Sequence, residues 1–175
     1  MDGDPGDLRE DAPADPYEVA REIALRKLTS RDCSRSELQK ALAKKLVLDE
    51  VVQEVLDRLE EVGLIDDARF GAAWATSRHE NRKLSSFAIA RELNAKGLDR
   101  DTIQEAVAGI DRDSELETAR SLAARKRRTL AGLPRATVQR RLGGLLARKG
   151  YGSSVVTQVV REFLDGDDDE SSDRD

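Results

Sequence analysis

Residues 89–110 read IARELNAKGLDRDTIQEAVAGI, and the same pattern of apolar and basic positions occurs twice more in the chain. It recurs without gaps at residues 38–59 and at residues 142–163. The six matched positions of the three copies are Leu38, Leu42, Lys45, Val52, Leu56 and Leu59; Ile89, Leu93, Lys96, Ile103, Val107 and Ile110; and Leu142, Leu146, Lys149, Val156, Val160 and Phe163. A repeat of this length predicts tandem modules that bury their apolar faces partly against one another.

Apolar residues recur at helical spacing throughout residues 17–164, and no stretch shows the alternation of a β-strand. No proline occurs between residues 17 and 133, so long helices are permitted there. The sequence therefore predicts an all-α fold of three tandem three-helix modules. We place these modules at residues 17–64, 65–111 and 112–164.

Several residues mark the expected helix ends. Ser34 and Glu37 have the spacing of a capping box, and Asp49 is expected to cap the helix that follows it. In copies two and three, glycine follows the lysine of the repeat, where a left-handed conformation ends a helix without steric cost to glycine. The first copy has Leu46 at this position, so we expect that helix end to be less favourable.

The net charge of −5 hides an uneven distribution. Residues 1–18 and 165–175 each carry −6, so residues 19–164 carry +7. Acidic ends with few apolar residues bury too little surface to order themselves, and we expect disordered tails at residues 1–16 and 165–175. Such tails usually act as solubilising segments. The alternative is that they compete for the basic part of the chain as internal mimics of DNA.

The segment from Thr118 to Arg161 contains no acidic residue and eleven basic ones. Uncompensated like charges repel one another and favour an anionic partner, either DNA phosphate or an acidic protein groove. The eleven residues are Arg120, Arg125, Lys126, Arg127, Arg128, Arg135, Arg140, Arg141, Arg148, Lys149 and Arg161. The first module adds Arg31, Arg35, Lys40, Lys44 and Lys45. We hypothesise that the two sets line one continuous surface.

No group of residues predicts catalysis, a metal site or a bound cofactor. His79 is the single histidine and Cys33 the single cysteine, and neither has partners at metal-ligand or Cys–His dyad spacing. Asp66 and Asp67 form the obvious carboxylate pair, but a helix start explains both of them. The glycine pair in the third module lacks the spacing of a phosphate-binding loop. The sequence therefore predicts a binding protein rather than an enzyme.

The sequence also indicates where such a protein acts. One cysteine suits a reducing compartment, and no apolar run approaches the roughly 20 residues needed to span a bilayer. No apolar signal core occurs at the N-terminus. We therefore expect a cytoplasmic protein without a membrane partner. No dimerisation element is evident, which favours a monomer.

The run Gly63-Leu64-Ile65-Asp66-Asp67-Ala68-Arg69-Phe70, followed by Trp74 and Arg78, resembles the signature of the RecX family. The runs at residues 24–28, 34–38 and 89–98 fit as well, and the resemblance covers about residues 17–164. Its structural signature residues here are Asp66, Asp67, Arg69, Phe70 and Trp74. The leucine of the first copy departs from the glycine expected there, and the acidic tails are not carried over from the family.

The resemblance implies three tandem three-helix modules in an elongated, curved repeat protein. It implies binding along the groove of the RecA recombinase filament, including the DNA within it, with free single-stranded DNA as a further candidate. Such proteins act in DNA repair, homologous recombination and the SOS response. They regulate RecA mainly by inhibiting its ATPase, filament growth and strand exchange, without cofactors or chemistry of their own.

Two other functions stay open on the sequence alone. A helix-turn-helix protein acting on duplex DNA or promoters would also have three-helix units, but the basic residues are not concentrated on one recognition helix. An operator-specific footprint would favour that function. A general helical adaptor would instead bind partners other than the recombinase.

Overall fold

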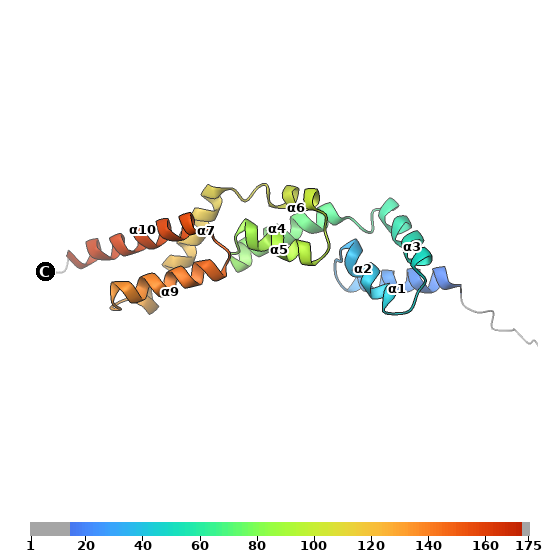
Figure 1. Ribbon diagram of the computed structural model, residues 1–175, viewed down its shortest axis with the longest axis horizontal. Coiled ribbons are helices and arrows are strands. Elements are labelled where there is room, and N and C mark those ends of the chain that lie inside the picture. The colour runs from blue at the N-terminus through green and yellow to red at the C-terminus, as the bar shows by residue number, and fades with distance from the viewer. Residues whose placement is uncertain (1–14, 173–175) are drawn as a thin grey trace, which may run out of the picture. The chain divides into compact units, whose positions relative to one another are not determined.

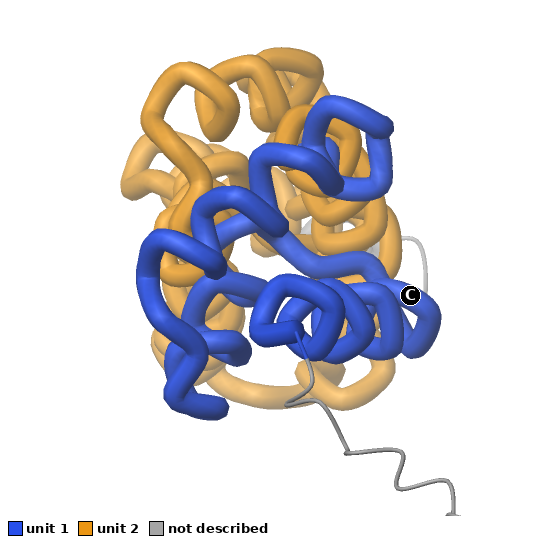
Figure 2. The backbone as a smooth tube through the Cα atoms, turned by 90° about the vertical axis from the view of Figure 1, so that its right-hand side faces the viewer, with its two compact units in different colours: residues 1–66 blue, residues 67–175 orange. Residues whose placement is uncertain are grey.

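The computed structural model describes residues 15–172, with side chains as far as Gly166. Its described residues form ten helices and no strand, as the apolar spacing predicts (Figure 1). The chain divides into two compact units at Asp66, drawn in different colours in Figure 2. The disordered N-terminal tail was expected over residues 1–16. Residues 1–14 lie outside the described part of the chain, whereas Asp15 caps the first helix and Pro16 begins it.

The first unit is one three-helix module. Helices α1 (Pro16–Ser30), α2 (Arg35–Ala43) and α3 (Asp49–Glu61) all pack against one another. Their buried residues are Ala20, Ala24, Cys33, Leu38, Leu42, Val52, Val55, Leu56, Leu59 and Ile65. Cys33 belongs to this core, although it lies in the loop between α1 and α2.

The second unit begins with α4 (Asp67–Arg82), α5 (Ser86–Ala95) and α6 (Arg100–Val107), which again pack pairwise. The buried residues of this second module are Phe70, Ala75, Ile89, Leu93, Leu98 and Ile103. It has the smallest set of buried residues of the three modules in the described part of the chain. Partly buried side chains such as Trp74 and Ile110 extend it.

The third module contains α7 (Arg112–Ala124), α8 (Arg127–Leu130), α9 (Arg135–Arg148) and α10 (Ser153–Ser172). Helices α7 and α9 both pack against α10 (Figure 1). The short α8 was not expected. Helix α10 also continues beyond Leu164, the expected module end, into residues assigned to the acidic tail. The remaining tail residues 173–175 lie outside the described chain.

The register of the repeat is confirmed by burial at matched positions. Leu38, Ile89 and Leu142 are at most 1% exposed, and the leucines four residues later in each copy are fully buried. Each pair lies in the core-facing stripe of α2, α5 or α9. The apolar pattern therefore predicts the face that each of these three helices buries.

Helix caps are partly as expected. Ser34 and Glu37 form the predicted capping box, with Ser34 Oγ accepting from the backbone N–H of Glu37 at 3.2 Å. The prediction for Asp49 is wrong, because Leu48 occupies the cap position of α3 and supplies no side-chain hydrogen bond. The helix starts one residue earlier than expected. Asp49 instead lies in the first turn, where its charge favours the positive end of the helix dipole.

The second helix of each module ends in a left-handed residue. Gly97 and Gly150 have φ angles of 81° and 89°, as the sequence predicts. Leu46 has a φ of 59°, so the first module makes the same turn without glycine. Because its side chain is 92% exposed, Leu46 gains little from burial in return for this strained conformation.

Gly150 also lies at a close joint between the second and third modules, both of which belong to the second unit. A Cβ atom added there would lie 2.6 Å from Ser85 Oγ and from Ala88 Cβ. Beside it, the backbone N–H of Ser85 donates to the carbonyl of Lys149 at 3.1 Å. The hydroxyl of Tyr151 donates to the carbonyl of Lys83 at 2.9 Å. These contacts fix α9 against the start of α5.

The strained end of α2 gives a stability prediction. We expect Leu46→Gly to raise the local free energy of unfolding of the first module by roughly 0.5–1 kcal/mol, because glycine adopts a positive φ without strain. Hydrogen-exchange protection of amides in α1–α3 measures this. The matched control Ala43→Gly, in helical conformation, should lower protection by about 0.5 kcal/mol. Equal effects of the two changes would contradict the account.

Candidate partner-binding surface

The basic residues of the third module come from all four of its helices and the connections between them. Arg125 ends α7 as its C-cap, and α8 begins at Arg127. The four consecutive bases from Arg125 to Arg128 therefore do not lie on one continuous helix. The break separates their directions and places Lys126 between two helix ends.

Four of the eleven bases are engaged within the chain. Arg120 makes a two-fold contact with Glu162, with Nε to Oε2 at 2.7 Å and Nη2 to Oε1 at 2.9 Å. Arg135 pairs with Asp165 at 3.1 Å, and Arg127 lies 5.1 Å from the ring centre of Phe163. These three contacts all attach to α10.

Lys149 is the fourth engaged base, since its Nζ donates to the carbonyl of Arg82 at 2.7 Å. This lysine therefore belongs to the joint between modules two and three. Sequence reasoning missed these roles because Glu162 lies one residue beyond the acid-free segment and a backbone carbonyl leaves no charge signal.

The contact with Arg120 sets the protonation of Glu162. Hydrogen bonds from Arg120, and then from Gln158, lower the pKa of Glu162 to about 2. The same contact raises the pKa of Arg120. Arg161, on the exposed side of α10, adds a weaker favourable charge. The pair is therefore ionised at any neutral pH and ties α7 to α10.

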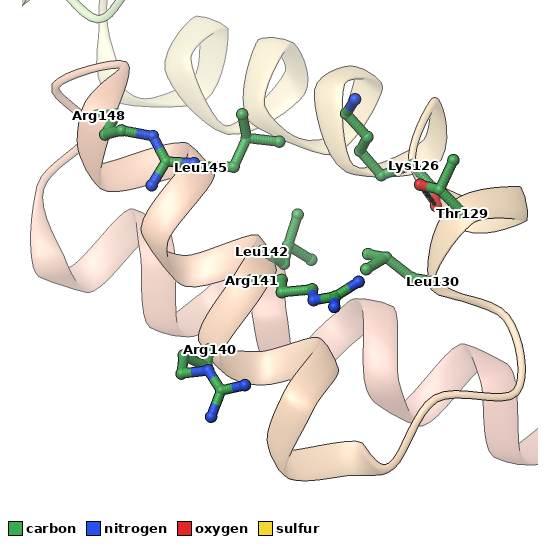
Figure 3. A pocket seen from close by; sticks show the side chains of 8 residues that line it. All are labelled: Lys126, Thr129, Leu130, Arg140, Arg141, Leu142, Leu145 and Arg148. Atoms are coloured by element: carbon green, nitrogen blue, oxygen red, sulfur yellow. Dashed lines mark hydrogen bonds between the residues drawn. The ribbon is translucent and has the colours of Figure 1, made fainter.

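Besides Arg161, whose charge favours ionised Glu162, six bases of the segment are exposed and form no ion pair within the described residues. They are Arg125, Lys126, Arg128, Arg140, Arg141 and Arg148. Four of them gather around one pocket of about 470 Å³ between α8 and α9 (Figure 3). Its lining consists of Lys126, Thr129, Leu130, Arg140, Arg141, Leu142, Leu145 and Arg148.

Figure 3 shows how these side chains are arranged. The guanidinium of Arg141 extends toward Leu130, and Leu142 and Leu145 lie between Arg148 and Lys126 in this view. Arg140 points away from the other lining side chains. Four cations around one hollow repel one another, so an anionic group placed there would be stabilised. This pocket is the strongest candidate site in the described chain.

A second pocket of about 230 Å³ lies between α7 and α10. Two of the predicted bases, Arg120 and Arg127, line it together with Glu162 and Phe163. Here the charge of Arg120 is neutralised by Glu162, and Arg127 lies against an aromatic ring. This pocket therefore has less uncompensated positive charge and would stabilise an anionic ligand less.

The first module shows the same division. Arg35 ties α2 to α3 through Asp57 at 2.6 Å and Glu60 at 2.7 Å. Arg31 pairs with Glu37 at 3.2 Å, and this hydrogen bond raises the pKa of Arg31. Lys40, Lys44 and Lys45 are exposed around the end of α2. That these lysines continue the surface of the third module stays a prediction.

The signature residues stabilise the second module. The rings of Phe70 and Trp74 stack with centres 5.7 Å apart, and Phe70 is buried. The Nε1 group of Trp74 donates to Glu92 at 2.9 Å. Arg78 and Lys96 lie 3.9 and 4.1 Å from the centre of a Trp74 ring. Trp74 is thus held in a cluster of cations and one carboxylate.

The other signature residues lie at the start of α4. Asp66 directly precedes the helix, and Asp67 and Arg69 are its first and third residues. A carboxylate at this end of a helix is favoured by the helix dipole. The predicted position of the carboxylate pair at a helix start is therefore seen in the structure.

The described residues contain no group of three or more His, Cys, Asp or Glu side chains that is arranged to hold a metal ion. The ring of His79 instead contacts the carbonyl of Leu84 at 2.9 Å and the hydroxyls of Ser114 and Thr118 at 3.1 and 3.0 Å. It therefore joins α4 to α7. None of the described helices is both long and apolar enough to cross a membrane.

These features define a class of protein: tandem three-helix modules, the third of which carries an unneutralised basic pocket. The same division appears in comparisons with known families. Models of the first, second and third three-helix domains of RecX match residues 20–59, 66–107 and 113–160. The chain belongs to the RecX family.

Curated relatives extend over most of the chain. A protein named Regulatory protein RecX from Streptomyces coelicolor is 48% identical over 160 residues, which cover 90% of this chain and 85% of that protein. Its namesake from Thermobifida fusca is 43% identical over 166 residues, covering 95% and 89%. The Mycobacterium tuberculosis protein of that name is 44% identical over 147 residues, covering 82% and 84%.

Solved structures agree on the fold. The crystal structure of RecX from Lactobacillus salivarius superposes with a TM-score of 0.78 at 18% identity, covering 86% of this chain and 98% of that chain. A second crystal structure of a regulatory protein RecX gives a TM-score of 0.73 at 24% identity, with coverages of 83% and 72%. The three-module helical fold is therefore shared at low sequence identity.

The Arg120–Glu162 pair predicts how stability depends on pH. Since the pKa of Glu162 is lowered in the folded state, the stabilisation is complete above its ordinary value of 4.5 and is lost as pH falls through about 2. A pair this exposed to solvent makes only a small contribution to stability. Thermal unfolding from pH 7 to pH 2 should show Glu162→Gln converging with the wild type only below pH 4.5. Convergence already at pH 6, or a similar profile for the unpaired control Glu105→Gln, would contradict this assignment.

Proposed function

We propose that this protein binds the filament of a RecA recombinase and lowers its ATP hydrolysis, its growth and its strand exchange. The observation that carries the proposal is the basic pocket between α8 and α9, whose cations lack acidic partners within the described residues. The choice of partner rests on the resemblance to the RecX family, which implies the RecA filament, and relatives covering most of the chain are named Regulatory protein RecX. The DNA phosphates of a filament carry negative charge, and acidic residues in a groove of the protein would do the same, so either could pair with these cations.

The proposed contact set consists of the exposed bases. In the third module these are Arg125, Lys126, Arg128, Arg140, Arg141 and Arg148. In the first module they are Lys40, Lys44 and Lys45. The bases already engaged within the chain act indirectly. Arg120 and Arg135 hold α10, Arg35 holds α3, and Lys149 holds the joint that positions α9.

Regulation of this kind requires binding alone. A ligand changes an assembly equilibrium only through its different affinity for the assembled and dissociated states. A protein that binds the filament and blocks the addition of protomers, or blocks the closing motion of each ATPase cycle, therefore inhibits without a catalytic residue. The proposal places the protein in the cytoplasm, as a monomer without cofactor, acting in DNA repair, recombination and the SOS response.

The test is the ATP hydrolysis of RecA on single-stranded DNA, with the full-length protein titrated below one molecule per RecA protomer. Inhibition by at least half, at ratios of about one to ten or lower, is expected if the protein blocks filament growth. An unchanged rate together with direct binding to duplex DNA would contradict the proposal. That result would support the helix-turn-helix alternative.

A further inference from the structure

The pocket between α8 and α9 has an apolar floor beneath its cations. Leu130 and Leu142 are 6% and 1% exposed, and Leu145 is partly buried. Thr129 supplies the one uncharged polar side chain among the lining residues, and no aromatic residue lines the pocket. The hollow therefore combines an aliphatic surface with a cationic rim (Figure 3).

This combination fits nucleic acid poorly. Phosphate groups would pair with the cations of the rim. Their polar oxygen atoms would then lie over three leucine side chains, with which they form no favourable contact. Proteins that bind single strands without sequence preference place aromatic rings beneath the bases, and the pocket has none. Contacts to DNA phosphates also need no apolar floor, because backbone phosphates are reached from exposed cations alone.

An acidic peptide segment fits both parts of the pocket. An aliphatic or aromatic side chain would pack over Leu145, the floor leucine that stays partly exposed, and over the aliphatic stems of the rim residues, which is favourable in proportion to the apolar area covered. Carboxylates on either side of it would meet Arg141 and Arg148, and arginine pairs with carboxylates through two parallel hydrogen bonds. Peptide segments that insert apolar anchors into a groove between helices are a common mode of recognition.

We propose, resting on the proposed function, that this pocket takes a short acidic segment of the recombinase itself. The segment inserts one apolar side chain over Leu130, Leu142 and Leu145, and its carboxylates pair with Arg141, Arg148 and Lys126. The pocket is then a contact to protein within the filament. The chain's own end, DGDDDESSDRD at residues 165–175, has the charge but no apolar side chain to cover the floor.

The test separates the floor from the rim. Affinity of the full-length protein is measured for RecA filaments assembled on a thirty-nucleotide oligo(dT) with a slowly hydrolysed ATP analogue, and for the free oligo(dT). Leu145→Gln and Arg141→Gln should each weaken filament binding about tenfold or more, the size expected of a buried anchor and its charge partner. Leu145→Gln should leave the affinity for free oligo(dT) unchanged.

Matched controls lie in the same module. Arg161→Gln removes an equal charge from an exposed arginine outside the pocket and outside the proposed contact set, and Leu133→Gln makes the same polar change at a partly buried leucine that does not line it. Leu145→Met keeps the floor apolar and should bind as the wild type does. Circular dichroism confirms that each variant is folded at the assay temperature.

Two results would overturn the inference. If Leu145→Gln binds the filament as Leu133→Gln does, while Arg141→Gln weakens filament and oligo(dT) equally, the pocket is a nucleic-acid site. If the wild-type protein does not bind the filament, the proposed function is wrong. That result differs from one in which the wild type binds and the pocket variants have no effect, which would disprove the pocket inference alone.

A second measurement identifies the occupant. Carbodiimide coupling joins an amine to a carboxylate without a spacer, and Lys126 lies on the rim of the pocket. In the filament complex, Lys126 should couple to an Asp or Glu of the recombinase that has an apolar neighbour in sequence. Coupling instead to residues 1–14 or 165–175 of this chain would show that its own acidic ends fill the pocket, and would overturn the inference.

Discussion

The contact of Gly150 with Ser85 and Ala88 positions the third module, which carries the basic pocket, against the second. The second module buries the fewest residues of the three among those described, so its own core gives it little rigidity. The glycine at the end of α9 lets the third module lie directly against the backbone of the second module. Hydrogen bonds from Lys149 and Tyr151 stabilise this contact. Burial raises the pKa of the Tyr151 hydroxyl, which therefore stays a donor at every physiological pH. Because α9 leads from this joint to the basic pocket, the joint holds the pocket's wall in place.

Ion pairing within the chain divides the basic residues into two groups with different roles. Arg120, Arg135 and Arg35 each reach a carboxylate on another helix, so their charge holds helices together. The cations of the pocket between α8 and α9 have no such partner within the described residues. Neighbouring cations without acidic partners repel one another and lower the stability of the fold, which is a common consequence of keeping a surface available for binding. The proposed contact surface follows from this division rather than from the total charge.

Much of the fold follows from the sequence, because helical modules depend on a local, periodic signal. Leu38, Ile89 and Leu142 lie in matched register and are buried as expected. Details that depend on single residues were less predictable. The helix after Leu48 starts one residue early, and α7 ends within the basic run, where the sequence has no glycine or proline; Gly132 and Pro134 mark only the later end of α8. The acid-free segment located the basic module, but not the partners of Arg120 or Lys149, since these depend on contacts across the fold.

The central claim is that the unneutralised cations of the third module make the contact with the filament. The most direct test is the equilibrium affinity for the RecA filament after reversal of Arg140 and Arg141 to glutamate. The account predicts at least about tenfold weaker binding. Reversal of Arg21 and Arg26 on α1, which changes the net charge equally, should have a much smaller effect. Equal losses from the two double variants would show that net charge alone drives binding, and unchanged affinity for the first would contradict the account.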